Sequence, residues 1–219
     1  MKTPFTVDQF LEVFKNYNES VFPVQVLFYL VAWFAIYLVT RQSTKSNRVI
    51  SGVLSFYWLW MGVVYHLVFF ATVNKAAYLF GSLFILQSAL FLIFGAFSDR
   101  LSFRFNTDVY GITGLALTFF ALFVYPLYGY FNGHVYPYSP TFGLPCPTTI
   151  FTFGILLMTD SKVPVVILIV PVIWSLIGFM AAINLGITED IGLLVAGIVA
   201  ASLLLYRNRS SEEIKAAGA

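Results

Sequence analysis

Long apolar segments, separated by short polar ones, make up most of the chain. A helix that spans a membrane needs about 20 largely apolar residues. Six segments meet this length: 22–40, 49–72, 76–97, 109–131, 164–186 and 188–206. A seventh, 148–158, would cover only about 16 Å as a helix, roughly half of the hydrocarbon core. The pattern therefore predicts an all-α integral membrane protein with about seven transmembrane helices, one of them short.

The basic residues indicate whether the short segment crosses, because cytoplasmic loops carry an excess of Lys and Arg. With seven crossings and an outer N-terminus, the cytoplasmic side holds Arg41, Lys45, Arg48, Arg100, Arg104, Lys162, Arg207, Arg209 and Lys215, and the outer side holds Lys2, Lys15 and Lys75. If the short segment turned back, Lys162 and the three later basic residues would move outside. Only the crossing arrangement keeps the excess inside, so we predict an outer N-terminus and a cytoplasmic C-terminus.

Residues 1–20 differ from the rest because they are polar and mixed in charge, without the order of a cleavable signal peptide. Thr6 and Gln9 have the spacing of a capping box, and Phe5 and Phe10 that of a hydrophobic staple. One apolar face is formed by Val7, Phe10, Leu11, Phe14 and Tyr17. The pattern predicts an amphipathic helix on the membrane surface.

The resulting organisation is a single membrane domain over residues 1–219. It consists of the interfacial helix at 1–20, a transmembrane bundle at 22–206 and a cytoplasmic tail at 207–219. The sequence shows no linker, second domain or convincing internal repeat.

Composition supports this assignment and excludes some functions. The chain of 219 residues is 59% hydrophobic, 19% aromatic and 10% charged, whereas soluble domains carry about 25% charged residues. The mean hydropathy is +0.85. A net charge of +2 without a basic tract gives no basis for binding nucleic acid. The expected environment is the lipid bilayer.

The only cysteine, Cys146, lies between two prolines in "TFGLPCPTTIFTFG". Proline disfavours a helical residue before it and favours the first helical position, so we expect Cys146 to cap the short helix and Pro147 to begin it. The preceding loop would then enter the outer leaflet as irregular backbone, which is tolerated only where protein buries it or where it lines a cavity. The loop is a candidate wall of an outward-facing pocket. Alternatively, Cys146 is an inert buried residue.

Other polar residues gather toward the outer side. His66 lies about 9 Å below the outer end of the second span, His134 lies in the outer loop before Cys146, and Gln87 lies in the middle of the third span. Titratable residues inside spans tend to face a cavity or the bundle interior. The candidate ligand-binding residues are His66, Gln87, His134, Cys146, Thr148 and Thr149. The alternatives are that His66 is hydrogen-bonded between helices, that His134 is an ordinary loop residue, and that the threonines bond to their own helix.

The phrases "PFTVDQF", "YHLVFF" and "FGLPCPTTIFTFG" resemble those of an uncharacterised bacterial multipass membrane protein family, a domain of unknown function. The resemblance runs from about Pro4 to about Leu194. It implies a bacterial inner (cytoplasmic) membrane location and implies no activity.

Four functions are compatible with these residues. The one we favour is the binding or passage of a small ligand or ion through an outward-facing pocket. A second is the handling of copper, zinc or haem by His66, His134 and Cys146; the sequence itself specifies no cofactor. A third is an enzyme with Cys146 as nucleophile, for which nothing suggests a substrate. The last is a non-catalytic subunit of a membrane complex, and a homo-oligomer is also compatible.

Overall fold

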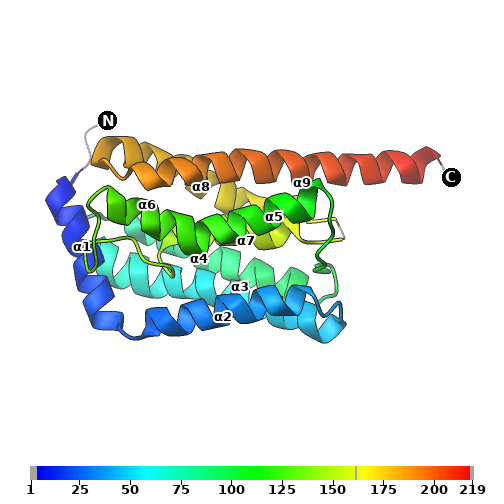
Figure 1. Ribbon diagram of the computed structural model, residues 1–219, viewed down its shortest axis with the longest axis horizontal. Coiled ribbons are helices and arrows are strands. Elements are labelled where there is room, and N and C mark those ends of the chain that lie inside the picture. The colour runs from blue at the N-terminus through cyan, green and yellow to red at the C-terminus, as the bar shows by residue number, and fades with distance from the viewer. Residues whose placement is uncertain (1–3, 161, 218–219) are drawn as a thin grey trace.

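The computed structural model describes residues 4–160 and 162–217 (Figure 1), and this part of the chain is all-helical, without a β-strand. The α-helices are α1 (Val7–Val21), α2 (Val24–Val39), α3 (Thr44–Trp60), α4 (Ala77–Phe91), α5 (Val109–Phe119), α6 (Tyr125–Phe131), α7 (Pro145–Leu157), α8 (Val165–Leu185) and α9 (Ile191–Ala217). Shorter 3₁₀- or π-helical segments extend or precede them, namely η1 (Met61–Phe69), η2 (Phe70–Thr72), η3 (Leu92–Ala96), η4 (Phe120–Val124) and η5 (Thr188–Asp190).

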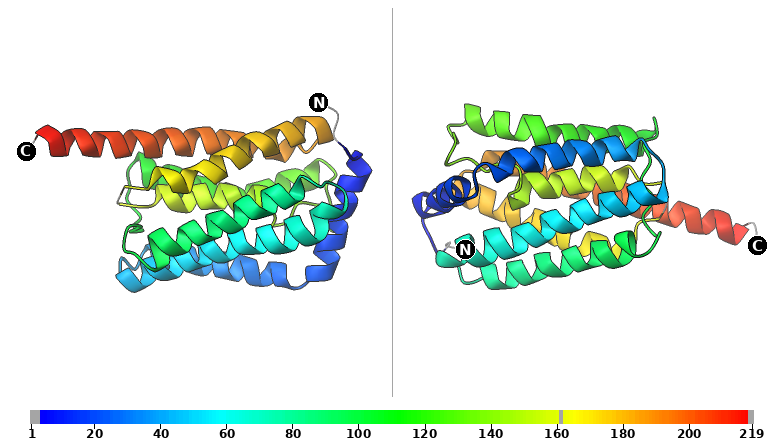
Figure 2. Two further views of the ribbon diagram at one scale, coloured as in Figure 1. Left: turned by 180° about the vertical axis from the view of Figure 1, so that it is seen from behind. Right: turned by 90° about the horizontal axis from the view of Figure 1, so that it is seen from below.

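Helices α2 to α9 run roughly along a common axis and alternate in direction, except that α6 continues α5 in one span, while α1 lies across one end of the bundle (Figures 1 and 2). The chain bends by 83° between α1 and α2. The end covered by α1 also carries the turn before α4 and the segments 132–144 and 186–190. The opposite end carries 40–43, 97–108, 158–160 and 162–164, and α9 extends well beyond it. We call these the α1 end and the α9 end.

Several helices have the length and composition of membrane spans. Within the described residues, five qualify: Thr44–Thr72, Ala77–Ala96, Val109–Phe131, Val165–Leu185 and Thr188–Ser210. The number rises to six if the bent pair α1 and α2 counts as one span. The predicted all-helical fold with several apolar spans is therefore confirmed at five to six long helices. The seventh predicted span, α7, has 13 residues.

The short helix α7 lies inside the bundle (Figure 2). Of its residues, only Cys146 is not buried. Protein contacts enclose α7, so a helix too short to cross a bilayer can still bury its apolar surface. Phe142, Gly143 and Leu144, directly before it, are buried too, and at Gly143 the backbone φ is +102° with an added Cβ only 2.2 Å from a ring carbon of Phe28. Only glycine fits this approach.

The first turn of α7 differs from the prediction. Leu144 is the N-cap, Pro145 is the first helical residue, and Cys146 is the second. Cys146 is thus inside the helix and does not cap it. Both prolines fit because the N–H groups of the first turn have no partner within a helix. This geometry overrides the preference of a residue before proline for extended backbone.

Helix α1 has the predicted cap. The Thr6 hydroxyl accepts from the Gln9 N–H at 3.2 Å, the Gln9 side chain accepts from the Thr6 N–H at 2.9 Å, and the rings of Phe5 and Phe10 stack at 5.7 Å. The predicted apolar face is wrong at Val7, which is 39% exposed. Phe5, which precedes the helix, takes the place of Val7 in the buried stripe beside Phe10. This stripe packs on protein at the α1 end, where the Phe10 and Phe70 rings lie 5.8 Å apart.

Candidate functional site

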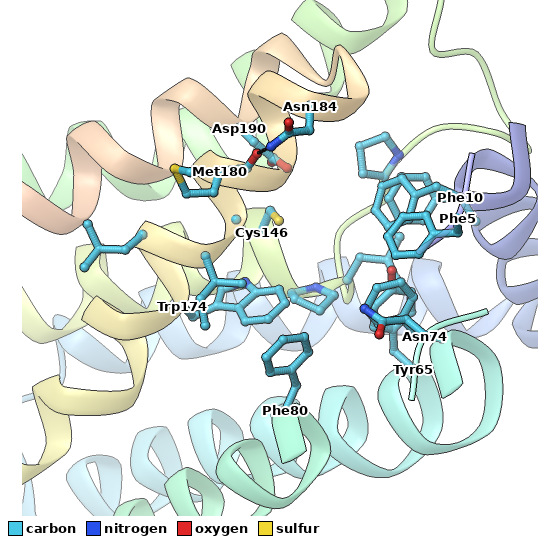
Figure 3. Close-up of a pocket in the computed structure, with 18 of the residues that line it drawn as sticks. Phe5, Phe10, Tyr65, Asn74, Phe80, Cys146, Trp174, Met180, Asn184 and Asp190 are labelled. Atoms are coloured by element: carbon cyan, nitrogen blue, oxygen red, sulfur yellow. Dashed lines mark hydrogen bonds between the residues drawn. The ribbon is translucent and has the colours of Figure 1, made fainter. Parts of the chain in front are cut away.

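A cavity of about 510 Å³ lies at the α1 end, between α1, η1, α4, the start of α7 and α8 (Figure 3). Its walls are mainly aromatic. The rings on the side of α1, η1, η2 and α4 are those of Phe5, Phe10, Phe14, Tyr65, Phe70 and Phe80. Helix α8 supplies Trp174, Leu176, Ile177 and Met180. Leu176 is 53% exposed and Met180 is 58% exposed, so the cavity reaches the surface of the bundle beside α8.

One part of the cavity is polar, where α7, α8 and η5 meet. Cys146, Trp174 and Asp190 all line it (Figure 3). A Cβ built at Gly178 would lie 3.7 Å from the Cys146 Sγ and 3.9 Å from the Trp174 Nε1, so both atoms face the space beside Gly178. The thiol also lies next to the Asp190 carboxylate. Within the described chain, the buried Trp174 indole N–H has no hydrogen-bond partner of normal geometry, although the Cys146 thiol lies near it, which leaves a donor at the polar part.

Asp190 reaches this position because the chain reverses after α8. Gly186 ends α8 in the left-handed conformation, with φ of +73°, and η5 then turns the chain into α9. The Tyr125 hydroxyl donates to Asp190 Oδ1 at 2.5 Å. Asp190 is only 5% exposed, and no cationic side chain pairs with it among the described residues. Tyr125 supplies a hydrogen bond but no positive charge.

The neighbouring carboxylate has a different environment. The Glu189 side chain is fully buried, and its Oε1 lies 2.7 Å from the His134 Nδ1. Gly129 leaves room for it, because an added Cβ there would lie 2.9 Å from Oε1. The pair holds the segment 132–144 against η5. His134 therefore lies behind the cavity wall with Glu189, and it is absent from the lining.

His66 is fully buried, and neither ring nitrogen has a hydrogen-bond partner in the described chain. Its ring packs against Phe84 at 4.6 Å and Trp174 at 5.1 Å between centroids. The alternative of a histidine hydrogen-bonded between helices is therefore not what the structure shows. His66 lies directly behind Trp174, one layer away from the cavity lining.

The remaining predicted residues lie deeper and have structural contacts. The Gln87 Nε2 donates to the Ile167 carbonyl at 3.0 Å and links α4 to α8. The Thr148 hydroxyl accepts from the Gly143 N–H at 3.0 Å and holds the irregular segment on α7. The Thr149 hydroxyl is buried without a partner. Of the six predicted site residues, the structure places only Cys146 in the cavity lining.

The proposed metal ligands are also separated. No group of three or more His, Cys, Asp or Glu side chains in the described chain is arranged to hold a metal ion. His66 packs against Phe84 and Trp174, and His134 contacts Glu189. Of the three proposed ligands, only Cys146 is among the lining residues. The sequence places Glu189 and Asp190 in the last outer loop, but the candidate site residues did not include Asp190, although an acidic pair between two long apolar segments was an available signal.

These features define a class of protein. It is a bundle of apolar helices with a cavity at one end, and its helices are compatible with multipass membrane insertion. The chain belongs to a family of unknown function, DUF6064, whose profile matches residues 7–215. The predicted resemblance is confirmed at the level of an uncharacterised family. No curated protein and no solved structure matches the chain.

Proposed function

We propose that this chain is a multipass protein of the bacterial cytoplasmic membrane that binds a small ligand in the cavity at the α1 end. The observation that carries the proposal is the cavity itself. Its volume of about 510 Å³ falls within the range of about 300–1,000 Å³ that is usual for small-molecule sites. Apolar and aromatic walls with a few convergent polar groups are also typical of such sites.

The sidedness of the bundle supports this location. The segments at the α9 end hold Arg41, Arg100 and Arg104, and Arg48 lies near the start of α3, so the positive-inside rule favours a cytoplasmic position for that end. The cavity would then open on the outer side, as the sequence predicts. Helix α1 would lie at the outer surface and cover the bundle.

Binding is better supported than passage. Between the cavity and the α9 end lies α7, whose side chains beyond Cys146 are all buried. Gln87, the residue expected on a path inward, is fully buried and bonded to α8. The handling of a metal ion by His66, His134 and Cys146 loses support because the structure does not bring these residues together.

The single cysteine provides a direct test. The protein in isolated membranes would be treated with N-ethylmaleimide, and alkylation of Cys146 would be followed by intact mass, with and without tert-butylbenzene as a neutral probe of the cavity. We expect the probe to slow alkylation several-fold. The variant Leu176→Trp fills the mouth and should slow alkylation without a probe, whereas Ile183→Trp, on the exposed face of α8 outside the lining, should not.

Unchanged alkylation under all of these conditions would contradict the proposal, provided that denatured protein is alkylated completely. Equal slowing in Leu176→Trp and Ile183→Trp would show that the effect comes from the bilayer and would also contradict it.

A further inference from the structure

We infer that the ligand is an organic ammonium cation with an apolar or aromatic body, whose charge lies at Asp190. The inference rests on the proposed function and adds the chemical class of the ligand. It is carried by a buried carboxylate that lacks a cationic partner and by the aromatic cavity into which that carboxylate is placed.

The charges around the cavity are not balanced. Buried carboxylates are normally paired, because burial without compensation is costly. Glu189 has a partner at one oxygen, because its Oε1 lies 2.7 Å from the His134 Nδ1, which can carry a positive charge. Asp190 has no cationic partner among the described residues, although only 5% of it is exposed. Among the described lining residues there is no Lys, Arg or His. The cavity therefore has one acidic group, and its missing partner would have to enter with the ligand.

The walls suit a cation with little hydration. A ligand cation within about 6 Å of an aromatic ring is attracted by the negative face of that ring. The rings of Tyr65, Phe80 and Trp174 line the cavity (Figure 3), as does that of Phe70. The rest of the lining is apolar except for Asn74 and Asn184, and it would hold the body of the ligand. An anion would meet repulsion from Asp190 and, behind it, Glu189.

The Trp174 N–H and the Cys146 thiol complete the polar part. Trp174 is 7% exposed, and its indole N–H has no hydrogen-bond partner of normal geometry in the described chain. A donor at this position could bond to an oxygen on the ligand next to the ammonium group, as in an amino alcohol or a choline-like molecule. Cys146 lies beside it, so a bound ligand would cover the thiol.

Two molecules of the same shape, one cationic and one neutral, test whether the cavity recognises the charge of the ligand. Phenyltrimethylammonium and tert-butylbenzene differ by a nitrogen cation in place of a carbon. Binding of radiolabelled phenyltrimethylammonium to the full-length protein in lipid nanodiscs would be measured by equilibrium dialysis. We expect saturable binding, and we expect Asp190→Asn to weaken it by about tenfold or more, since a charge-assisted contact is lost. Asn can still accept from Tyr125, so the fold should be kept.

Asp99→Asn is the matched control. Asp99 is an exposed carboxylate at the α9 end, paired with Arg48 at 3.2 Å, and its loss should leave binding unchanged. Protection of Cys146 by tert-butylbenzene should be the same in Asp190→Asn as in the original protein. If Asp190→Asn fails to fold, the unsubstituted protein still tests the inference. The cation should bind to it at least several-fold more tightly than tert-butylbenzene does.

The results distinguish a wrong ligand class from a wrong function. If tert-butylbenzene protects Cys146 and the cation binds no better, the cavity binds ligands but the cationic class is wrong. If the cation binds and Asp190→Asn has no effect, Asp190 is not the counter-charge and the inference fails. If neither molecule binds, the proposed function fails as well.

Discussion

The two ends of the bundle are built differently around the same central helix, α7. At the α9 end, buried polar groups have side-chain partners. The Asn208 side chain bonds to both the backbone N–H and the backbone carbonyl of Val163, and the Arg207 guanidinium donates to the Thr159 hydroxyl at 2.6 Å. Among the described residues, the α1 end has more buried polar atoms without a partner, including both His66 nitrogens, the Trp174 Nε1 and the Glu189 Oε2, although the Ser98 hydroxyl at the α9 end also has none. The comparison teaches that one end is organised for stability, whereas the other leaves donors and a carboxylate around a cavity.

Backbone packing shows the same contrast. Toward the α9 end, α5 and α7 touch through glycines, so that a Cβ built at Gly154 would lie 2.7 Å from the Gly114 carbonyl oxygen. At the α1 end, α8 diverges from α1 and η1, and aromatic rings line the space between them (Figure 3). Close backbone approach leaves no volume for a ligand, whereas large rings on diverging helices enclose one.

The largest expected effect is the labelling of the two ends from opposite sides of the membrane. In a Cys146→Ser background, Asn132→Cys marks the α1 end and Lys45→Cys marks the α9 end; both positions are exposed. A charged, membrane-impermeant thiol reagent added to intact cells should label Asn132→Cys and leave Lys45→Cys unlabelled until the cells are opened. The reverse pattern would place the cavity on the cytoplasmic side.

A smaller effect is expected at the α1 end where a buried carboxylate does have a histidine partner. His134→Ala leaves the fully buried Glu189 carboxylate without its partner, so the free energy of unfolding should fall by about 3 kcal/mol. Reversible unfolding in mixed micelles measures this change. In a Glu189→Gln background the same His134→Ala substitution should cost much less. If the two costs were equal, the two residues would not be coupled, and η5 would not be held by this pair.

The smallest of the three effects tests the close packing of α5 and α7. Gly154→Ala should destabilise the bundle by about 2 kcal/mol through overpacking, because the added carbon lies 2.7 Å from both the Gly114 carbonyl oxygen and a methyl group of Thr118. Gly52→Ala, which has no atom within 4 Å, is the control and should not lower the unfolding temperature. A tolerated Gly154→Ala would show that the α9 end can relax, which would weaken the contrast between the ends.

The candidate site was only partly predictable. Cys146 stood out in the sequence because it is the single cysteine, between prolines, and the structure places it in the cavity. His134 and His66 were chosen for their residue type, yet the first bonds to Glu189 and the second lies behind Trp174. Residue type shows what a side chain could do, but its neighbours across the bundle decide what it contacts.

By itself, the sequence determined the all-helical class, the approximate bounds of the apolar helices and the capped N-terminal helix. These features depend on local periodicity and on contacts between residues a few positions apart, such as Thr6 with Gln9. Only the tertiary structure decided that α7 is enclosed, that α1 covers one end, and that Asp190 lies in an aromatic cavity without a cationic partner. Those features depend on contacts between segments tens of residues apart, such as Tyr125 with Asp190, and no short stretch of sequence contains them.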